Sequence, residues 1–261
     1  MESGLAAGII FPLKTRKDYS AGPFRRFWRL GLDLVYPQHC LSCGAWVGRS
    51  NAGHICGECA SKVQLIGPEQ CRRCGMPLGP YTAVRKECIH CRGAVLRFKA
   101  VSAPCRYEGV VRELIHAFKY RKATFLAAAF GEMMIRDLAG ADMVKEASAV
   151  VPVPLHRRKW AARGYNQAEL LAERIVRHYG LPLLVGNLTR VRYTPSQTRL
   201  SRAQREENLR GAFAVRRPED LKGRKILLCD DVMTTGATGS ECARVLLAAG
   251  AKAVYVSVAA R

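Results

Sequence analysis

Two adjacent carboxylates followed by a run of hydroxyl groups have the spacing of a sugar-phosphate site. An apolar strand leads into Asp230 and Asp231, and a helical pattern begins a few residues later. The loop between them consists of Thr234, Thr235, Gly236, Ala237 and Thr238. A loop at a helix start offers free N–H groups to a phosphate, and its glycine lets the backbone approach closely. The two carboxylates suit two vicinal hydroxyls and their bound Mg²⁺. We therefore expect a phosphorylated sugar as ligand.

A second group of reactive side chains consists of four CxxC pairs. The pairs are Cys40 and Cys43, Cys56 and Cys59, Cys71 and Cys74, and Cys88 and Cys91. Twelve residues separate the first two pairs and 13 separate the last two. This spacing predicts two structural zinc ions, each bound by four cysteines. We assign consecutive pairs to each ion, although crossed pairs also fit the spacing. Redox or iron–sulfur sites are the alternatives, and four evenly spaced copies do not suit them.

The charge of the chain favours a polyanionic partner. The 261 residues include 42 Lys and Arg against 21 Asp and Glu, which gives a net charge of +21. Such a field attracts nucleic acid, although it also serves simply to prevent self-association. The start of the chain lacks the basic leader of a secretory signal, and the apolar stretch at residues 5–13 is too short to cross a bilayer. In such a chain the eleven cysteines favour metal ligands or free thiols over disulfides. We therefore expect a cytoplasmic protein without membrane insertion.

The elements that must position these groups divide the chain near residue 96. We expect a mobile N-terminus with a basic amphipathic helix at residues 24–36, together spanning residues 1–36. A double zinc ribbon at residues 37–96 and an α/β domain at residues 97–261 follow. Apolar strands near residues 100–107, 147–152, 183, 225–229 and 253–258 alternate with helices near residues 109–120, 125–138, 166–179 and 239–249. Alternation of this kind predicts a Rossmann-like parallel sheet, with ligands at the carboxyl ends of its strands.

The segment at residues 226–238 resembles the signature of type I phosphoribosyltransferases, which bind phosphoribosyl pyrophosphate (PRPP) with Mg²⁺. The resemblance implies that Asp230 and Asp231 are the catalytic acids that hold the ribose 2′- and 3′-hydroxyls. The five residues from Thr234 to Thr238 would then bind the 5′-phosphate. Thr234 stands where purine-salvage members have an acid, so the segment is closer to the orotate type. The acceptor of the phosphoribosyl group stays open.

In that family a pyrophosphate loop and a mobile lid precede the signature. A cationic loop follows the strand near residue 150, and we assign to it Arg157, Arg158, Lys159, Arg163, Gly164 and Asn166 as pyrophosphate ligands. A solvated basic loop is the alternative. The stretch at residues 190–213 lacks periodicity, and a connection of that length is usually functional. We expect a lid there, with Gln197, Arg202, Arg205 and Asn208 closing over the site.

Taken together, the four CxxC pairs and the segments at residues 151–172, 196–213 and 227–238 resemble the ComF family of competence proteins. The resemblance implies a role in DNA uptake during natural transformation, with single-stranded DNA and proteins of the uptake machinery as partners. Phosphoribosyl transfer to an unknown acceptor is the enzymatic hypothesis. A non-catalytic PRPP-responsive regulator and a DNA-binding accessory on an inactive scaffold are the alternatives. We further expect zinc removal to unfold the N-terminal module and to leave ligand binding by the second domain intact.

Overall fold

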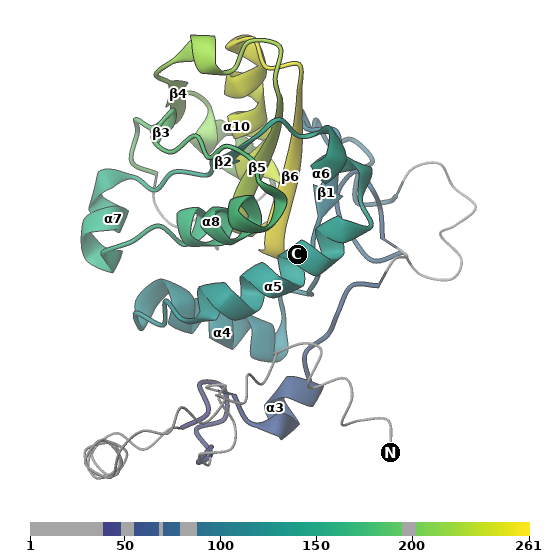
Figure 1. Cartoon of the computed structure of the whole chain (residues 1–261), viewed down its shortest axis with the longest axis vertical. Helices are drawn as coiled ribbons and strands as arrows, with labels where there is room; N and C mark the ends of the chain where they lie inside the picture. The colour runs from purple at the N-terminus through teal and green to yellow at the C-terminus, as the bar shows by residue number, and fades with distance from the viewer. Residues whose placement is uncertain (1–38, 48–54, 68–69, 79–87, 195–201) are drawn as a thin grey trace. The chain divides into compact units, whose positions relative to one another are not determined.

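The computed structural model describes residues 39–47, 55–67, 70–78, 88–194 and 202–261 of the chain (Figure 1). The N-terminal segment with its expected helix at residues 24–36 lies outside the described residues, and so does Gln197. The helices of the described residues are α3 (Gly57–Ser61), α4 (Gly109–Tyr120), α5 (Leu126–Ala139), α6 (Asp142–Glu146), α7 (Arg157–Arg163), α8 (Gln167–Tyr179), α9 (Arg202–Leu209), the 3-10 turn η1 (Pro218–Asp220) and α10 (Ala237–Ala248). The strands are β1 (Val101–Ser102), β2 (Ala149–Pro152), β3 (Leu188–Arg190), β4 (Phe213–Val215), β5 (Lys225–Val232) and β6 (Ala253–Ala260).

A four-stranded parallel sheet in the order β1-β6-β5-β2 forms the centre of the α/β domain. Leu228 of β5 pairs with Val151 of β2 on one side and with Val256 of β6 on the other. Every residue of β2 and β6 is buried, because parallel strands are covered on both faces and therefore need continuous apolar runs. The predicted parallel α/β sheet is confirmed.

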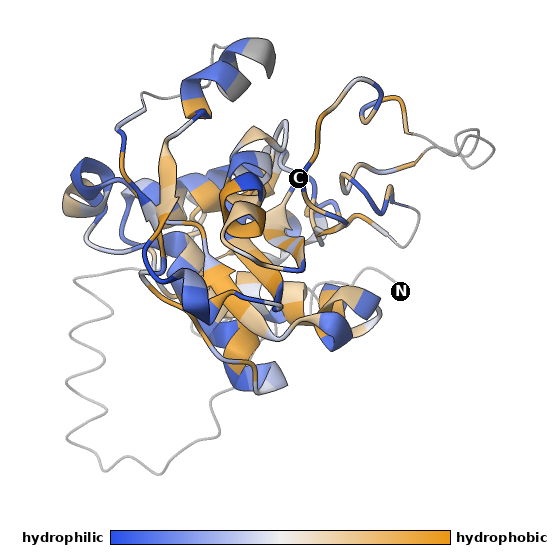
Figure 2. Cartoon of the chain, turned by 90° about the horizontal axis from the view of Figure 1, so that it is seen from above, coloured by the Kyte–Doolittle hydropathy of each residue, from blue (hydrophilic) through white to orange (hydrophobic). Residues whose placement is uncertain are grey.

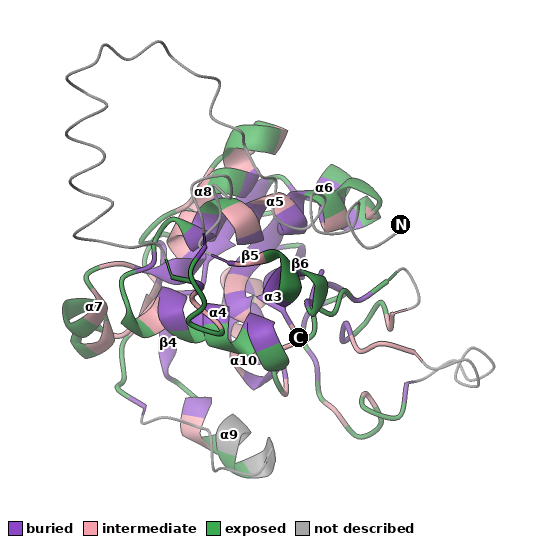
Figure 3. Cartoon of the chain, turned by 90° about the horizontal axis from the view of Figure 1, so that it is seen from below, coloured by how far each residue is buried: buried purple, intermediate pink, exposed green. Residues whose placement is uncertain are grey.

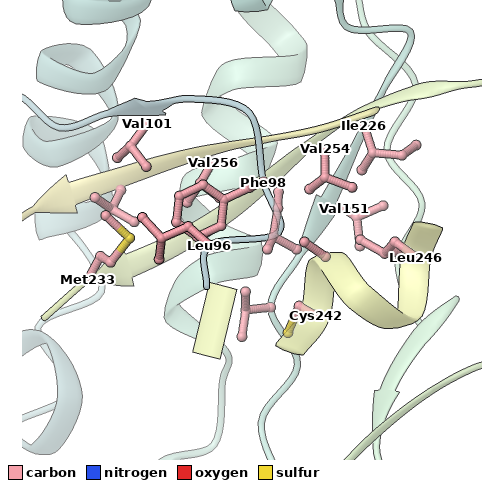
Figure 4. Packing of buried hydrophobic residues seen from close by; sticks show 14 of the residues in the cluster. Leu96, Phe98, Val101, Val151, Ile226, Met233, Cys242, Leu246, Val254 and Val256 are labelled. Atoms are coloured by element: carbon pink, nitrogen blue, oxygen red, sulfur yellow. The ribbon is translucent and has the colours of Figure 1, made fainter. Parts of the chain in front are cut away.

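Helices cover both faces of this sheet (Figure 1). Helices α5 and α8 pack together against one face, and α10 packs against the other. On the α10 side, Cys242 and Leu246 meet alternate residues of the strands, among them Val254 and Val256 (Figure 4). Hydrophobic colour is concentrated at these strands in Figure 2, and the same strands are buried in Figure 3. The sheet is thus a fixed frame whose carboxyl edge can position a site.

Three parts of the domain differ from the sequence-based expectation. The cationic segment after β2 is not a loop but the helix α7, and the expected irregular lid contains the helix α9. The strand expected around Leu183 is a single bridge to Val150, whereas β3 and β4 form a separate antiparallel pair. Both helical stretches are short, α7 is strongly basic and α9 is mostly polar, so neither shows the apolar periodicity by which longer helices are identified.

Contacts divide the chain into two units. Residues 1–64 and 108–117 form one unit, and residues 65–107 and 118–261 form the other. The first unit contains the first two CxxC pairs, and the second unit contains the last two pairs together with the whole parallel sheet. The domain boundaries expected at residues 36 and 96 stay predictions. Within the part of the chain that the structure describes, no helix is both long and apolar enough to cross a membrane.

Candidate functional site

The two predicted acids lie at the carboxyl end of β5, the central strand next to β2. Asp231 is buried, with 7% of its surface exposed, and Asp230 is partly buried. The Oδ1 atom of Asp230 accepts a hydrogen bond of 2.8 Å from the backbone N–H of Asp231. Burial and the neighbouring charge of Asp231 raise the pKa of Asp230 to about 7. Two carboxylates crowded into one buried corner therefore favour a cation or a proton between them.

The predicted phosphate-binding loop, residues 234–238, follows β5 and is called the phosphate-type loop below. Gly236 adopts a left-handed conformation with φ of 82° and starts α10, so the first N–H groups of that helix are directed out of its end. The hydroxyl of Thr235 accepts from the N–H of Ala237 at 3.4 Å. Asp230 and the residues from Thr234 to Gly239 line one small cavity. The structure therefore brings together one of the predicted acids and all five predicted phosphate ligands.

Lys119, which the sequence analysis did not identify, supplies a cation to this corner. Its Nζ lies 2.9 Å from Oδ1 of Asp231, and both side chains are largely buried. Burial alone would lower the pKa of Lys119, but the charge of Asp231 and the hydrogen bond to it outweigh burial and raise this pKa. No local sequence signal links two residues that lie more than one hundred positions apart.

The end of α4 that carries Lys119 is held by residues that follow α7. The carbonyl oxygen of Phe118 accepts hydrogen bonds from Oη of Tyr165 at 2.5 Å and from Nε2 of Gln167 at 3.0 Å. The guanidinium of Arg163 lies over the ring of Tyr120, 5.0 Å from its centre. The cationic helix and the buried lysine are therefore fixed to each other.

Helix α7 replaces the predicted pyrophosphate loop, and its ends explain two of the predicted residues. His156 caps its start by accepting from the N–H of Arg158, and Gly164 ends it with φ of 82°. Asn166 caps α8, accepts from the N–H of Ala168 and donates to the carbonyl of Val153. Gly164 and Asn166 thus shape the segment, whereas the four predicted basic residues lie on α7, none of whose residues is buried (Figure 3).

Two cationic side chains of α7 lie over the ring of Tyr193. Its ring centre lies 5.3 Å from the guanidinium of Arg158 and 5.9 Å from the ammonium of Lys159, and the ring of His156 meets it edge-on. Burial, with the charges of Arg190, Arg163 and Lys119, lowers the pKa of Lys159 to about 8. Tyr193 lies near the start of the stretch where the sequence predicts a lid, and these contacts join the start of that stretch to α7.

Arg190 at the end of β3 is a second residue that the sequence analysis missed. Its guanidinium lies over the ring of Phe213 at 5.2 Å, and its buried Nε lacks a hydrogen-bond partner within the described residues. Burial lowers the pKa of Arg190, and the charge of Asp230 acts in the opposite direction. Arg190 therefore lies within electrostatic reach of both the acid pair and the cations of α7.

A larger cavity of about 520 Å³ opens between α7 and β3. Its volume lies within the usual range for small-molecule sites. The residues that give it chemical character are an indole, three guanidinium groups and one carboxylate, namely Trp160, Arg157, Arg190, Arg216 and Glu169. Trp160 is 54% exposed and offers a flat apolar face beside cations. This combination suits an anionic ligand with a planar ring.

The expected lid residues are only partly visible. Gln197 is outside the described residues, and Arg202 and Arg205 lie on α9 with side chains that are not described. Asn208 also lies on α9, and its backbone carbonyl accepts from Arg192 at 2.8 Å. Arg192 donates to the carbonyl of Arg210 as well, at 2.9 Å, so it ties the two sides of this connection together. The role of these residues as a lid stays a prediction.

The eight predicted zinc ligands form two groups of four. Cys40, Cys43, Cys56 and Cys59 form the first group, and Cys71, Cys74, Cys88 and Cys91 form the second. The sulfur of Cys43 lies 3.6 Å from that of Cys56 in the first group, and in the second group the Cys71–Cys91 and Cys74–Cys88 sulfurs lie 3.7 and 3.8 Å apart. Sulfurs bound tetrahedrally to one zinc ion at about 2.3 Å lie about 3.8 Å apart, so both groups fit the metal. The consecutive pairing is confirmed, and all eight thiols are free of disulfides.

The separate ligand sets predict independent zinc loading. Wild-type protein should contain about two zinc ions per chain, and the variants Cys40→Ser/Cys43→Ser and Cys88→Ser/Cys91→Ser should each contain about one. Metal content by mass spectrometry of the purified proteins measures this. Loss of both ions from either variant would contradict the independence of the two sites.

The crowded acids predict a pH-dependent stability. Because the pKa of Asp230 is about 7 when folded and about 4 when unfolded, the folded state keeps a proton between these values that the unfolded state has lost. This contribution to stability is therefore lost as the pH rises from 4 through 7. Urea unfolding at pH 5 and pH 8 should show that Asp230→Asn loses about 2 kcal/mol less than wild type over this interval. An equal loss in both proteins would contradict the assignment.

Comparison with known proteins identifies relatives across most of the chain. The family model of the double zinc ribbon domain matches residues 31–93. The DNA utilization protein YhgH of Salmonella typhi is 31% identical over 229 residues, which cover 85% of this chain and 96% of that protein. Competence protein F of Haemophilus influenzae is 29% identical, and the match covers 83% of this chain and 94% of that protein. Competence protein ComFC of Bacillus subtilis is also 29% identical, and the match covers 78% of this chain and 81% of that protein.

A solved structure titled as the allosteric regulatory enzyme of purine biosynthesis aligns with 54% of this chain at 20% identity and a TM-score of 0.32. The chain spans 25% of that protein, and a score this low is too weak to establish a shared fold. The sequence relatives are decisive, since one of them exceeds 30% identity over nearly its whole length. With its two four-cysteine groups and its parallel α/β domain, this chain belongs to the ComF family of competence and DNA-utilization proteins.

Proposed function

We propose that this chain binds PRPP with Mg²⁺ and single-stranded DNA in the service of DNA uptake, and that its PRPP site supports phosphoribosyl transfer to an acceptor. The observation that carries the proposal is the cavity shared by Asp230 and the loop from Thr234 to Gly239. It combines a carboxylate at a strand end with a helix start in one cavity. The names of the relatives, DNA utilization and competence proteins, support the link to DNA.

The chain's own groups suit each part of PRPP. The start of α10, with Gly236 and the threonine hydroxyls, would bind the 5′-phosphate, and the two carboxylates would accept hydrogen bonds from the ribose hydroxyls. Carboxylate oxygens are also the donors that Mg²⁺ prefers, and when bound the ion supplies positive charge to the pyrophosphate. The ammonium of Lys119 compensates Asp231 and leaves its second oxygen for the ligand.

The cations of α7 suit the leaving group. Displacement of pyrophosphate at the anomeric carbon passes through a state with oxocarbenium character, and such a state needs held geometry and charge stabilisation more than covalent help. Arg158 and Lys159 lie together against Tyr193, beyond the carboxyl end of β2. Arg190 joins them from β3, and its Nε has no hydrogen-bond partner among the residues that the structure describes. These groups would stabilise the departing phosphates.

Calorimetric titration tests the PRPP site. Wild-type protein should bind PRPP in the presence of Mg²⁺, and the double variant Asp230→Asn/Asp231→Asn should bind it about 100-fold more weakly, because it lacks charge-assisted hydrogen bonds to two hydroxyls. The exposed acid Asp142, replaced by Asn, is the control and should leave the affinity unchanged. Equal affinity in the double variant would exclude the site.

Turnover separates an enzyme from a sensor. An enzyme releases pyrophosphate from bound PRPP when a suitable acceptor is added, whereas a PRPP-responsive regulator binds the same ligand and releases none. The residues of the site are common to both, so the acceptor screen follows the titration.

The surface around α7 supports the proposal that the chain binds single-stranded DNA. Residues 156–224 contain sixteen Lys and Arg against six Asp and Glu. Trp160 and Tyr193 are 54% and 43% exposed among these cations. Positive grooves with exposed aromatic rings bind single strands, since the cations contact phosphates and the rings stack on bases. The 520 Å³ cavity beside Trp160 offers room for one base.

The exposed indole allows a matched test of DNA binding. Trp160→Ala should weaken binding of a labelled oligothymidine about tenfold in fluorescence anisotropy, because a base loses its stacking partner. Trp46→Ala removes an indole that is 68% exposed but belongs to the unit that contains the first cysteine group. This substitution should change the affinity for DNA less than twofold. Equal effects of the two substitutions would place the DNA elsewhere.

A further inference from the structure

The second cysteine group is followed by a segment that packs directly on the phosphate-type loop. A Cβ atom added to Gly236 would lie 3.1 Å from Cδ2 of Leu96 and 3.5 Å from Cζ of Phe98. One added to Gly239 would lie 3.4 Å from Cε1 of Phe98. Leu96 and Phe98 are 9% and 3% exposed and lie beside Met233 and Val256 in Figure 4. The loop therefore owes part of its shape to two residues that come just after Cys91.

Hydrogen bonds join the same two regions. The hydroxyl of Ser240, in the first turn of α10, donates to the carbonyl of Val95 at 2.8 Å and accepts from the N–H of Arg97 at 3.2 Å. Ser240 is itself 8% exposed, so this pair of bonds is shielded from water. The start of α10 is thus fixed to the chain that leaves the second cysteine group.

Arg261, the last residue of the chain, connects a cysteine ligand to the other side of the loop. Its Nε donates to the carbonyl of Cys74 at 2.5 Å, and its Nη1 donates to the carbonyl of Met233 at 3.3 Å. Met233 immediately precedes Thr234. The loop is consequently tied to the cysteine group on both sides, by Arg261 before it and by Ser240 after it.

The two cysteine groups differ in these contacts. Cys74 and Cys88 are 2% and 6% exposed and belong to the same apolar cluster as Val256 of β6. The backbone carbonyl of Arg72 accepts from the N–H of Val101 at 2.9 Å, which joins a CxxC turn to β1. The first group belongs to the other contact unit, which contains no residue of the phosphate-type loop.

We propose that the second four-cysteine site is the structural support of the phosphate-type loop, so that zinc bound there sets the affinity of the loop for its ligand. A four-cysteine turn of this size cannot keep its shape without metal, because it buries too little apolar surface by itself. Without zinc, Leu96, Phe98 and the carbonyl of Cys74 lose their fixed positions, and Gly236 is released from its packed conformation. Leu96, Phe98 and Arg261 are positioning residues for the loop.

This proposal rests on the proposed function only for the identity of the ligand. It departs from the expectation that both zinc ions belong to a separate N-terminal module, since it makes only the first site dispensable for ligand binding. Linkage adds a reciprocal effect: a ligand that binds the ordered loop must raise the affinity of the second site for zinc and leave that of the first site unchanged.

Hydrogen exchange of the full-length protein tests whether the second cysteine group supports the phosphate-type loop, and it needs no ligand. In Cys88→Ser/Cys91→Ser, the amides of residues 234–240 should exchange at least tenfold faster than in wild type, while those of α8 keep their protection and show that the sheet is folded. The matched variant Cys40→Ser/Cys43→Ser, which loses the other zinc, should leave residues 234–240 unchanged. Equal exchange of this loop in the two variants would overturn the proposal.

Arg261→Met covers the case in which the second-site variant loses its fold. It keeps all eight cysteines and a long apolar side chain but removes both hydrogen bonds, and it should also speed exchange of residues 234–240 at least threefold. Unchanged exchange there overturns the role of Arg261 in the support. Loss of protection in α8 of this variant, which keeps every zinc ligand, would likewise overturn the local role and indicate a general one.

Binding of PRPP with Mg²⁺ is the second readout. Its affinity should fall at least tenfold in Cys88→Ser/Cys91→Ser and less than twofold in Cys40→Ser/Cys43→Ser. If wild-type protein binds no PRPP, the proposed function fails, whereas the exchange experiment still decides the support because it needs no ligand.

Discussion

The site depends on how two neighbouring carboxylates are tolerated at the buried end of a strand. Asp230 and Asp231 lie where the apolar strand β5 ends, and burial together with their mutual repulsion raises the pKa of Asp230 to about 7. The ammonium of Lys119 offsets part of this repulsion at 2.9 Å. A corner of this kind is unfavourable for stability, which agrees with the binding role that we propose for it. Sugar hydroxyls and a divalent cation would satisfy the same charges.

The surrounding elements can be understood as supports for this corner. Tyr165 and Gln167, which follow α7, fix the carbonyl of Phe118 and so hold Lys119 in place. The second cysteine group and Arg261 fix the opposite side, where Gly236 and α10 begin. The metal site and the ligand site are therefore parts of one contact unit, although the cysteine pairs look alike in sequence.

Local patterns made most of the fold and half of the site predictable. The strand, acid pair and glycine of residues 226–238 are contiguous, and each CxxC pair is a complete local unit, so both could be identified from spacing. Lys119, Arg190 and Arg261 could not, because each acts on a residue at least 28 positions away that only the tertiary fold brings near. Helix α7 was missed for a different reason, since its seven residues bury none of their side chains and leave no apolar period.

Crystallography of the protein with PRPP and Mn²⁺, which has an anomalous signal and replaces Mg²⁺, tests the central claim most directly. We expect one anomalous peak within coordination distance of the bound PRPP at the carboxyl end of β5, with the 5′-phosphate at the start of α10 and the ribose hydroxyls on Asp230 and Asp231. PRPP bound only in the cavity between α7 and β3, with no peak near the two acids, would contradict the account.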